Sequence, residues 1–297
     1  MRTRGLRLAL ALAIAASSTL LAQTTEQTLY VSVLDKANHP VTGLAVSDFV
    51  VKEDGVAREV LRAGRTADPI DLAILVDNSQ AIQSYVNDVR KAVGSFMTRM
   101  AGEQSASVAL IGMADRPTGL QDYTSSVAVL QKASTKIFAQ PGAGTVFQDS
   151  INDALKGFKA RPNPRKAIVV ITTEGTDFSN VHYQRTLENL AGSGVALHVL
   201  VITNRSNEAF RDEQARDRAY VFDQGTSQTG GRRQDLLSSM ALAPGLDQVA
   251  EDLASQYKVV YARPGELIPP KAGPEIAVKR PDTTARGTLV RPVTPIA

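Results

Sequence analysis

The feature that most constrains this chain is an apolar run over residues 72–76 that ends in two oxygen-bearing side chains, Asp77 and Ser79. A run this short and this apolar predicts a strand buried on both faces, which is typical of a parallel sheet covered by helices. In such sheets, ligands bind beyond the carboxyl ends of the strands, where the strand order reverses. Asp77 and Ser79 are therefore candidates for ligand or metal binding. The alternative is that they only turn the chain and cap the next helix, because short motifs are common by chance.

Two later segments also place oxygen atoms at the end of a strand or the start of a helix. Residues 166–173 form a second buried-strand pattern, which is followed by Glu174 and Asp177. Between the two strands, a glycine-rich turn ends in Thr145 and opens an amphipathic helix. Hard cations such as Mg²⁺ prefer carboxylate and hydroxyl oxygens. The three junctions together predict a divalent-cation site at one edge of the sheet.

This arrangement resembles the von Willebrand factor type A domain. The metal-ion-dependent adhesion site of that family is written Asp-x-Ser-x-Ser, then a distant Thr, then an Asp before Gly. The residues that match are Asp77, Ser79 and Thr145, whereas Ala81 stands at the second Ser and Glu174 at the last Asp. The resemblance implies that Asp77, Ser79, Thr145 and Glu174 hold Mg²⁺. Because one hydroxyl is missing and Glu174 is one methylene longer, we expect weak or absent metal binding.

The same resemblance implies a partner. In the family pattern, a partner protein completes the coordination of the metal with its own carboxylate. We therefore expect a protein partner to dock at this edge of the sheet. Beside the four metal positions, the residues expected to contact it are Asn78, Gln80, Gly144 and Asp177.

Similarity extends to both ends of the chain and covers roughly residues 28–292. Residues 33–35, 40–44 and 48–55 resemble the front segment of a bacterial group usually called VWFA-related. Residues 229–232 and 254–257 resemble its later part. This resemblance concerns the architecture rather than an activity.

The alternation of strand and helix patterns predicts an α/β fold with a doubly wound, mostly parallel, Rossmann-like sheet. We assign that domain to residues 67–262, with a last strand at 257–261. Residues 23–66 are expected to form a small β unit. The proline- and glycine-rich tail at 263–297 contains two short strand patterns, which are expected to pack beside that unit as one β appendage.

The N-terminus predicts export. A basic leader is followed by an uncharged apolar stretch at residues 8–22, which is too short to span a membrane comfortably. We interpret residues 1–22 as a cleaved secretory signal, with an uncleaved membrane anchor as the alternative. The mature protein is expected to be periplasmic or secreted and not to be an integral membrane protein.

Charge and cysteine content constrain the partners and the stabilisation of the chain. The chain has 33 basic and 30 acidic residues, and its excess of positive charge lies in Arg2, Arg4 and Arg7 of the signal. The mature chain is therefore close to neutral, which argues against a nucleic-acid partner. The chain has no cysteine, so no disulfide stabilises the exported fold.

Motifs of enzymes are missing from the sequence. It contains neither a Gly-x-Ser-x-Gly elbow nor a phosphate-binding Gly-x-x-x-x-Gly-Lys loop. We therefore expect a binding protein rather than an enzyme. Three hypotheses stay open: a partner-binding module at the Asp77 edge with weak or no metal assistance, a metal-independent scaffold that uses loops or the β unit, and a metal-assisted hydrolase at the same edge.

Overall fold

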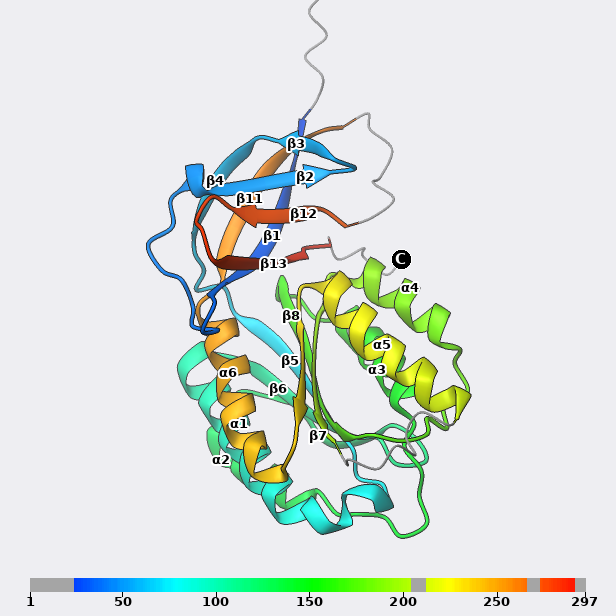
Figure 1. The fold of residues 1–297 in the computed structure, drawn as a ribbon. Helices are drawn as coiled ribbons and strands as arrows, with labels where there is room; N and C mark the ends of the chain where they lie inside the picture. Colours follow the sequence, from blue (N-terminus) through cyan, green and yellow to red (C-terminus); the bar gives the residue numbers. More distant parts are fainter. Residues whose placement is uncertain (1–23, 204–211, 266–272, 292–297) are drawn as a thin grey trace, which may run out of the picture.

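The computed structural model describes residues 24–203, 212–265 and 273–291, and shows a layered α/β domain joined to a smaller all-β unit (Figure 1). The predicted signal at residues 1–22 lies outside the described residues. Among the residues that are described, no helix has the length and apolar character needed to cross a membrane.

The α/β domain is built on a six-stranded sheet with the order β10-β9-β8-β5-β6-β7. All neighbouring pairs in this sheet are parallel except β6 with β7. From β5 the chain first builds outward on one side and then returns to place β8 on the other, so the strand order reverses between β5 and β8. The predicted doubly wound, mostly parallel sheet is confirmed. Its strands are β5 (Ile70–Val76), β6 (Ser107–Gly112), β7 (Thr118–Thr124), β8 (Arg165–Thr173), β9 (Ala196–Ile202) and β10 (Arg232–Leu236).

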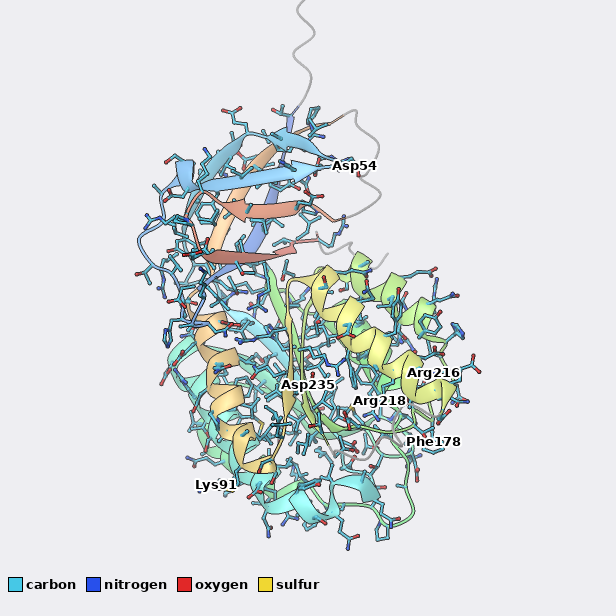
Figure 2. All side chains as sticks on the ribbon, viewed as in Figure 1. Asp54, Lys91, Phe178, Arg216, Arg218 and Asp235 are labelled. Carbon is cyan, nitrogen blue, oxygen red and sulfur yellow. The ribbon has the colours of Figure 1, made fainter. Side chains whose placement is uncertain are left out.

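Helices cover both faces of this sheet (Figure 1). One face packs against α1 (Val86–Gln104), α2 (Val127–Ala133) and α6 (Leu242–Ala254), and the other against α3 (Phe147–Phe158), α4 (Tyr183–Ser193) and α5 (Glu213–Thr229). In β5, Leu72 and Ile74 belong to the first core, whereas Ala73 and Leu75 belong to the second. Side chains fill the space between the layers (Figure 2). The unbroken apolar run that predicted a strand buried on both faces is explained by these two cores.

The two edge strands of the sheet have no counterpart in the sequence prediction. In β7, the side chains are intermediate or exposed, and β10 contains a single buried residue, Leu236. An edge strand is covered less than a central one, so it tolerates polar residues and carries a weaker hydrophobic pattern.

The smaller unit consists of two short sheets that enclose one core. A four-stranded sheet has the order β13-β1-β11-β4, and a three-stranded sheet has the order β12-β2-β3. The predicted β appendage made from both ends of the chain is confirmed, since the late strands β12 and β13 pair with the early strands β2 and β1. Its strands are β1 (Thr24–Asp35), β2 (Phe49–Glu53), β3 (Val56–Arg58), β4 (Val60–Arg65), β11 (Tyr257–Pro264), β12 (Glu275–Val278) and β13 (Thr283–Leu289).

The position of β11 differs from the sequence analysis, which places residues 257–261 in the sheet domain. The structure pairs β11 antiparallel with both β1 and β4. Tyr257, Val259 and Tyr261 alternate into the core of the β unit, where they join Leu29 and Phe49. An alternating pattern suits this two-layer unit better than a parallel sheet that is buried on both faces.

The β unit packs at the amino ends of the central strands (Figure 1). Asp77 follows the opposite, carboxyl end of β5. Arg165 at the start of β8 is buried and donates to the carbonyl oxygens of Asp68 at 2.7 Å and Leu253 at 2.6 Å. Arg286 of β13 forms an ion pair of 2.7 Å with Asp252 of α6. This arrangement leaves the loops at the carboxyl edge of the sheet on the opposite side of the molecule.

Candidate functional site

Asp77 follows β5 directly at the point where the strand order reverses. Its backbone N–H donates to the carbonyl oxygen of Ile171 at 2.8 Å, which extends the pairing with β8 by one residue. Its side chain is fully buried. One carboxylate oxygen, Oδ1, accepts from the backbone N–H of Ser79 at 3.0 Å. Asp77 therefore turns the chain out of the sheet while its second oxygen, Oδ2, remains available to other donors.

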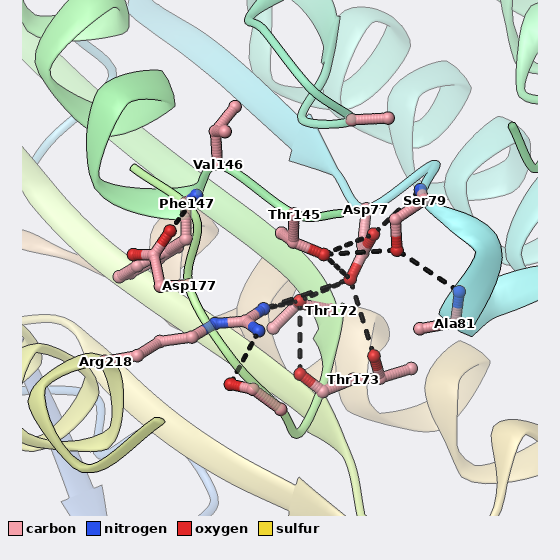
Figure 3. A network of polar contacts seen from close by, with 12 residues as sticks. Asp77, Ser79, Ala81, Thr145, Val146, Phe147, Thr172, Thr173, Asp177 and Arg218 are labelled. Atoms are coloured by element: carbon pink, nitrogen blue, oxygen red, sulfur yellow. Dashed lines mark hydrogen bonds and ion pairs between the residues drawn. The ribbon is translucent and has the colours of Figure 1, made fainter. Parts of the chain in front are cut away.

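Ser79 and Thr145 bring their hydroxyl groups to this carboxylate (Figure 3). The hydroxyl of Thr145 lies 3.1 Å from Oδ1 and 3.0 Å from Oδ2 of Asp77, and 3.1 Å from Oγ of Ser79. Ser79 Oγ also accepts from the backbone N–H of Ala81 at 3.3 Å, so it caps the short helix η2 (Gln80–Tyr85). Ser79 therefore does both things considered in the sequence analysis: its hydroxyl lies in the converging group around Asp77, and it caps a helix.

The loop that carries Thr145 is fixed from two sides. Backbone hydrogen bonds join Val146 N–H to the oxygen of Met113 at 2.8 Å and Phe178 N–H to the oxygen of Thr145 at 2.9 Å. This loop therefore bridges the segments that follow β6 and β8. The convergence of the three hydroxyl and carboxylate groups is built into the backbone pairing.

Three further residues complete the network, and the sequence analysis did not identify them. The hydroxyl of Thr172 donates to Asp77 Oδ2 at 2.9 Å, and that of Thr173 lies 3.5 Å from the same oxygen. Arg218 of α5 donates through Nη2 to the Thr172 hydroxyl, and the same nitrogen lies 3.9 Å from Asp77 Oδ2 (Figure 3). The guanidinium is thus linked to the carboxylate both directly and through a hydroxyl.

Arg218 is held in a closed environment. The residue is 2% exposed, and its guanidinium lies 5.7 Å from the ring centre of Phe147 and 5.4 Å from that of Phe222. Its Nη1 donates to the carbonyl oxygen of Gly175 at 3.2 Å. Burial lowers the pKa of Arg218, and the carboxylates of Asp77 and Asp177 act in the opposite direction. A guanidinium nevertheless stays protonated in proteins, so a permanent positive charge lies beside Asp77.

The donor set does not fit a tightly held Mg²⁺ ion. The converging side chains supply one carboxylate and two hydroxyls, and Ala81 offers no oxygen where the family pattern has a third hydroxyl. Within the described residues, no three His, Cys, Asp or Glu side chains are grouped so that they could hold a metal. The positive charge of Arg218 also neutralises the one acid of the converging group. The residues that surround Asp77 therefore form a hydrogen-bonded network around an ion pair.

Glu174, the fourth predicted metal position, lies near Arg218. It lines a small surface pocket together with Gly175, Arg218, Phe222 and Arg233. The pocket lies where α5 and β10 approach the loop after β8. Glu174 is thus part of the surroundings of the guanidinium.

Two of the residues predicted to contact a partner are buried. Asn78 accepts from the backbone N–H of Ala114 at 2.9 Å and so connects the ends of β5 and β6. Asp177 accepts from the backbone N–H groups of Phe147 at 3.0 Å and Gln148 at 3.3 Å, at the start of α3. A carboxylate at a helix N-terminus satisfies free N–H groups and opposes the helix dipole. Both residues therefore position loops, and their contact with a partner stays a prediction.

The other two, Gln80 and Gly144, lie nearer to the surface. Gln80 is exposed, and its Oε1 accepts from the backbone N–H of Gly142 at 2.8 Å. Gly144 lies under the ring of Phe178, where an added Cβ would be 2.3 Å from a ring carbon. A glycine is therefore required for Phe178 to occupy this position, on the surface beside the site (Figure 2).

Comparisons with known proteins agree with this geometry. The profile of the von Willebrand factor type A domain matches residues 71–230. No curated protein matches the chain. Similar folds occur among solved structures, and at the identities found the likeness shows the fold alone.

Three of these structures illustrate the range. The D319A mutant of the PilB minor pilin from Streptococcus sanguinis has 13% identity and a TM-score of 0.50, and the match covers 63% of this chain and 62% of that chain. Proximal thread matrix protein 1 from the mussel byssus has 16% identity and a TM-score of 0.50, with coverage of 68% and 49%. A structure of the same mussel protein with zinc in its metal-ion-dependent adhesion site has 15% identity and a TM-score of 0.49, with the same coverage. This chain thus spans less than two thirds of the length of either protein.

Proposed function

The chain belongs to the von Willebrand factor type A domain family, and from this we propose that it is an exported protein-binding module. It docks a protein partner at the carboxyl edge of the central sheet, with weak or no assistance from a divalent metal. The signal at residues 1–22, the β unit that begins at residue 23, the sheet domain that begins at residue 67 and the tail from residue 263 are part of this proposal, with β11 assigned to the β unit rather than to the sheet domain. So is its location in the periplasm or outside the cell.

One observation carries the proposal: two large aromatic side chains are exposed on the loops that build the site. Phe178 is 62% exposed and Phe138 is 61% exposed. Aromatic residues are enriched among the few side chains that dominate binding energy at protein interfaces. Both loops belong to the Thr145 region, since the backbone N–H of Phe178 donates to the carbonyl oxygen of Thr145 and Phe138 precedes the turn at Gly144 in the sequence.

These two rings are held in place before any partner arrives. Phe178 packs on Gly144, and the guanidinium of Arg90 lies 4.3 Å from the ring centre of Phe138. Arg90 also donates through Nε to the carbonyl oxygen of Ile137 at 2.6 Å. Because rigid contact groups lose less conformational entropy on binding, a fixed pair of aromatic rings favours a docking role.

Catalysis is not part of the proposal. Asp77 is fully buried, and both of its oxygens already accept hydrogen bonds from Ser79, Thr145 and Thr172. A general base or nucleophile must reach the reacting atom of a substrate, so we do not assign that role to the buried Asp77.

Gln80 and Ala81, which follow Ser79, are exposed. In this proposal, a partner side chain that approaches the network lies against them.

A capture experiment with a matched control tests the docking site. The mature protein is immobilised and incubated with periplasmic extract, with and without a chelator, and the Phe178→Ser variant is compared with Val56→Ser. Val56 is 55% exposed but lies on the β unit. We expect wild type and Val56→Ser to retain the same proteins in both buffers and Phe178→Ser to lose them. Retention by Phe178→Ser together with loss by Val56→Ser would instead assign docking to the β unit.

A further inference from the structure

We propose that Arg218 is a resident cation that takes the place of a divalent metal ion in this site. The inference concerns the same site as the proposed function. It rests on that function only for the statement that a partner docks at this edge of the sheet. Its test needs no partner protein.

The first argument is the charge of Asp77. Its carboxylate is fully buried, and a buried charge requires a compensating charge and hydrogen bonds. Within the described part of the chain, Arg218 is the cation that forms an ion pair with it, at 3.9 Å. The Thr172 hydroxyl accepts from Arg218 and donates to Asp77, so it transmits part of this interaction. The electrostatic requirement that a bound metal would meet is therefore met by a side chain.

The second argument is mechanical. A metal ion at such a site would connect the loops that carry its ligands. Arg218 connects the same parts of the fold: the end of β8 through Thr172, the following loop through Gly175, and the start of α3 through the ring of Phe147. Its ion pair with Asp77 adds the end of β5. One guanidinium thus joins all three junctions that the sequence analysis assigned to metal binding.

The third argument is the change at position 81. The hydroxyl that the family pattern has there would be a ligand for a metal, whereas the guanidinium donates instead to the Thr172 hydroxyl and to the carbonyl oxygen of Gly175. Ala81 instead contributes a backbone N–H to Ser79. The missing oxygen ligand at position 81 and the positive charge at position 218 both disfavour binding of a divalent metal ion. Both are explained if the guanidinium of Arg218 has replaced that ion.

Replacing the arginine should reopen the site to metal. We compare wild type, Ala81→Ser, Arg218→Met and the double variant Ala81→Ser/Arg218→Met. The readouts are the thermal midpoint with a chelator or with added Mn²⁺, and calorimetric titration with Mn²⁺. Wild type should show no metal-dependent shift of the midpoint. Arg218→Met should be less stable and should be stabilised by Mn²⁺, and the double variant should bind Mn²⁺ at least about ten-fold more tightly than Ala81→Ser alone.

Two controls keep the result interpretable. Arg218→Lys retains a positive charge and should stay insensitive to Mn²⁺. Asp77→Asn/Arg218→Met removes both buried charges, so it should be more stable than Arg218→Met and should not respond to Mn²⁺. This second variant also provides a reading if Arg218→Met fails to fold.

The proposal is overturned if wild type gains stability with Mn²⁺, or if folded variants without the arginine show no metal response. It is also overturned if Asp77→Asn/Arg218→Met is no more stable than Arg218→Met, because Arg218 then acts only by filling space. These outcomes are independent of the capture experiment. A metal response without loss of capture in Phe178→Ser would retain the resident cation and reject the docking site.

Discussion

The two ends of β5 each carry a fully buried aspartate, and they handle its charge differently. Asp71 at the amino end forms a direct ion pair of 2.6 Å with Arg161. Asp77 at the carboxyl end lies 3.9 Å from Arg218 and receives hydrogen bonds from hydroxyl groups instead. The Asp71 pair belongs to the half of the molecule that adjoins the β unit, whereas the Asp77 pair sits under the exposed loops of the site. A close ion pair thus compensates the charge of Asp71 directly, whereas hydroxyl groups and Arg218 share the compensation of Asp77, in keeping with the resident cation that we propose.

The largest effect should follow from removing the cation at the carboxyl end. Arg218→Met leaves Asp77 buried without its partner, and breaking a buried ion pair in this way costs about 3–5 kcal/mol. Urea unfolding in the presence of a chelator measures this loss. Asp77→Asn in the same background should recover most of it. A loss below about 1 kcal/mol would mean that the hydroxyl groups alone stabilise the carboxylate.

A smaller loss is expected at the amino end. Arg161 is partly exposed, and Asn163 also donates to Asp71 Oδ1 at 3.1 Å, so Arg161→Met leaves the acid with one partner. We expect a loss of about 1–3 kcal/mol in urea unfolding. Added Mn²⁺ should restore none of it, because no converging hydroxyl groups like those of Ser79 and Thr145 surround Asp71 in the contacts described. Equal metal responses at both ends would remove the distinction drawn between them.

The sequence predicted the residues at the carboxyl ends of the central strands better than it predicted the edge strands of the sheet. Buried apolar runs identify the strands that meet at the site, and the carboxyl ends of parallel neighbours must converge, which brings Asp77 and Thr145 together. Strands β7 and β10 could not be identified in this way, because edge strands are half exposed and carry polar residues.

Arg218 was missed for another reason. A single arginine on a helix is usually exposed to solvent. The pairing of Arg218 with Asp77 depends on tertiary packing between residues far apart in the chain. A signal was nevertheless present, since Ala215, Val221 and Phe222 surround position 218 at helical spacing and are all buried. A charged residue on the apolar side of a helix indicates a buried partner, although the sequence does not say which one.

Acid should lower the stability of the fold through His198, on the amino side of the sheet. His198 near the start of β9 is buried close to Arg232 and Arg286, and burial followed by the charges of these arginines lowers its pKa to about 3. The folded state therefore keeps this imidazole neutral, while the unfolded chain binds a proton below its ordinary pKa of 6.5. The contribution of neutral His198 to stability is therefore fully present above pH 6.5 and is lost as the pH falls toward 3. The loss is about 1.4 kcal/mol per pH unit for one proton.

Chemical unfolding between pH 7 and pH 5 measures this slope. His198→Leu should flatten it, whereas Arg218→Lys should leave it unchanged, because Arg218 belongs to the other end of the sheet. The ordinary pKa values of Asp and Glu side chains, about 3.9 and 4.3, lie below this range. A slope that persists in His198→Leu would show that another group controls the acid response.

The smallest effect is expected from restoring the missing hydroxyl alone. Ala81 is exposed on the rim, so Ala81→Ser should change the free energy of unfolding by no more than about 0.5 kcal/mol. A hydroxyl on a dication is a charge-assisted contact that would contribute about 1.5–3 kcal/mol in an open site. Here the guanidinium beside Asp77 opposes the ion, so the gain in Mn²⁺ affinity should stay below about ten-fold. Titration calorimetry of Ala81→Ser, and of Ala81→Ser/Glu174→Asp, measures it. A large gain with Arg218 intact would mean that the hydroxyl at position 81, and not the cation at position 218, decides whether this edge of the sheet accepts a metal.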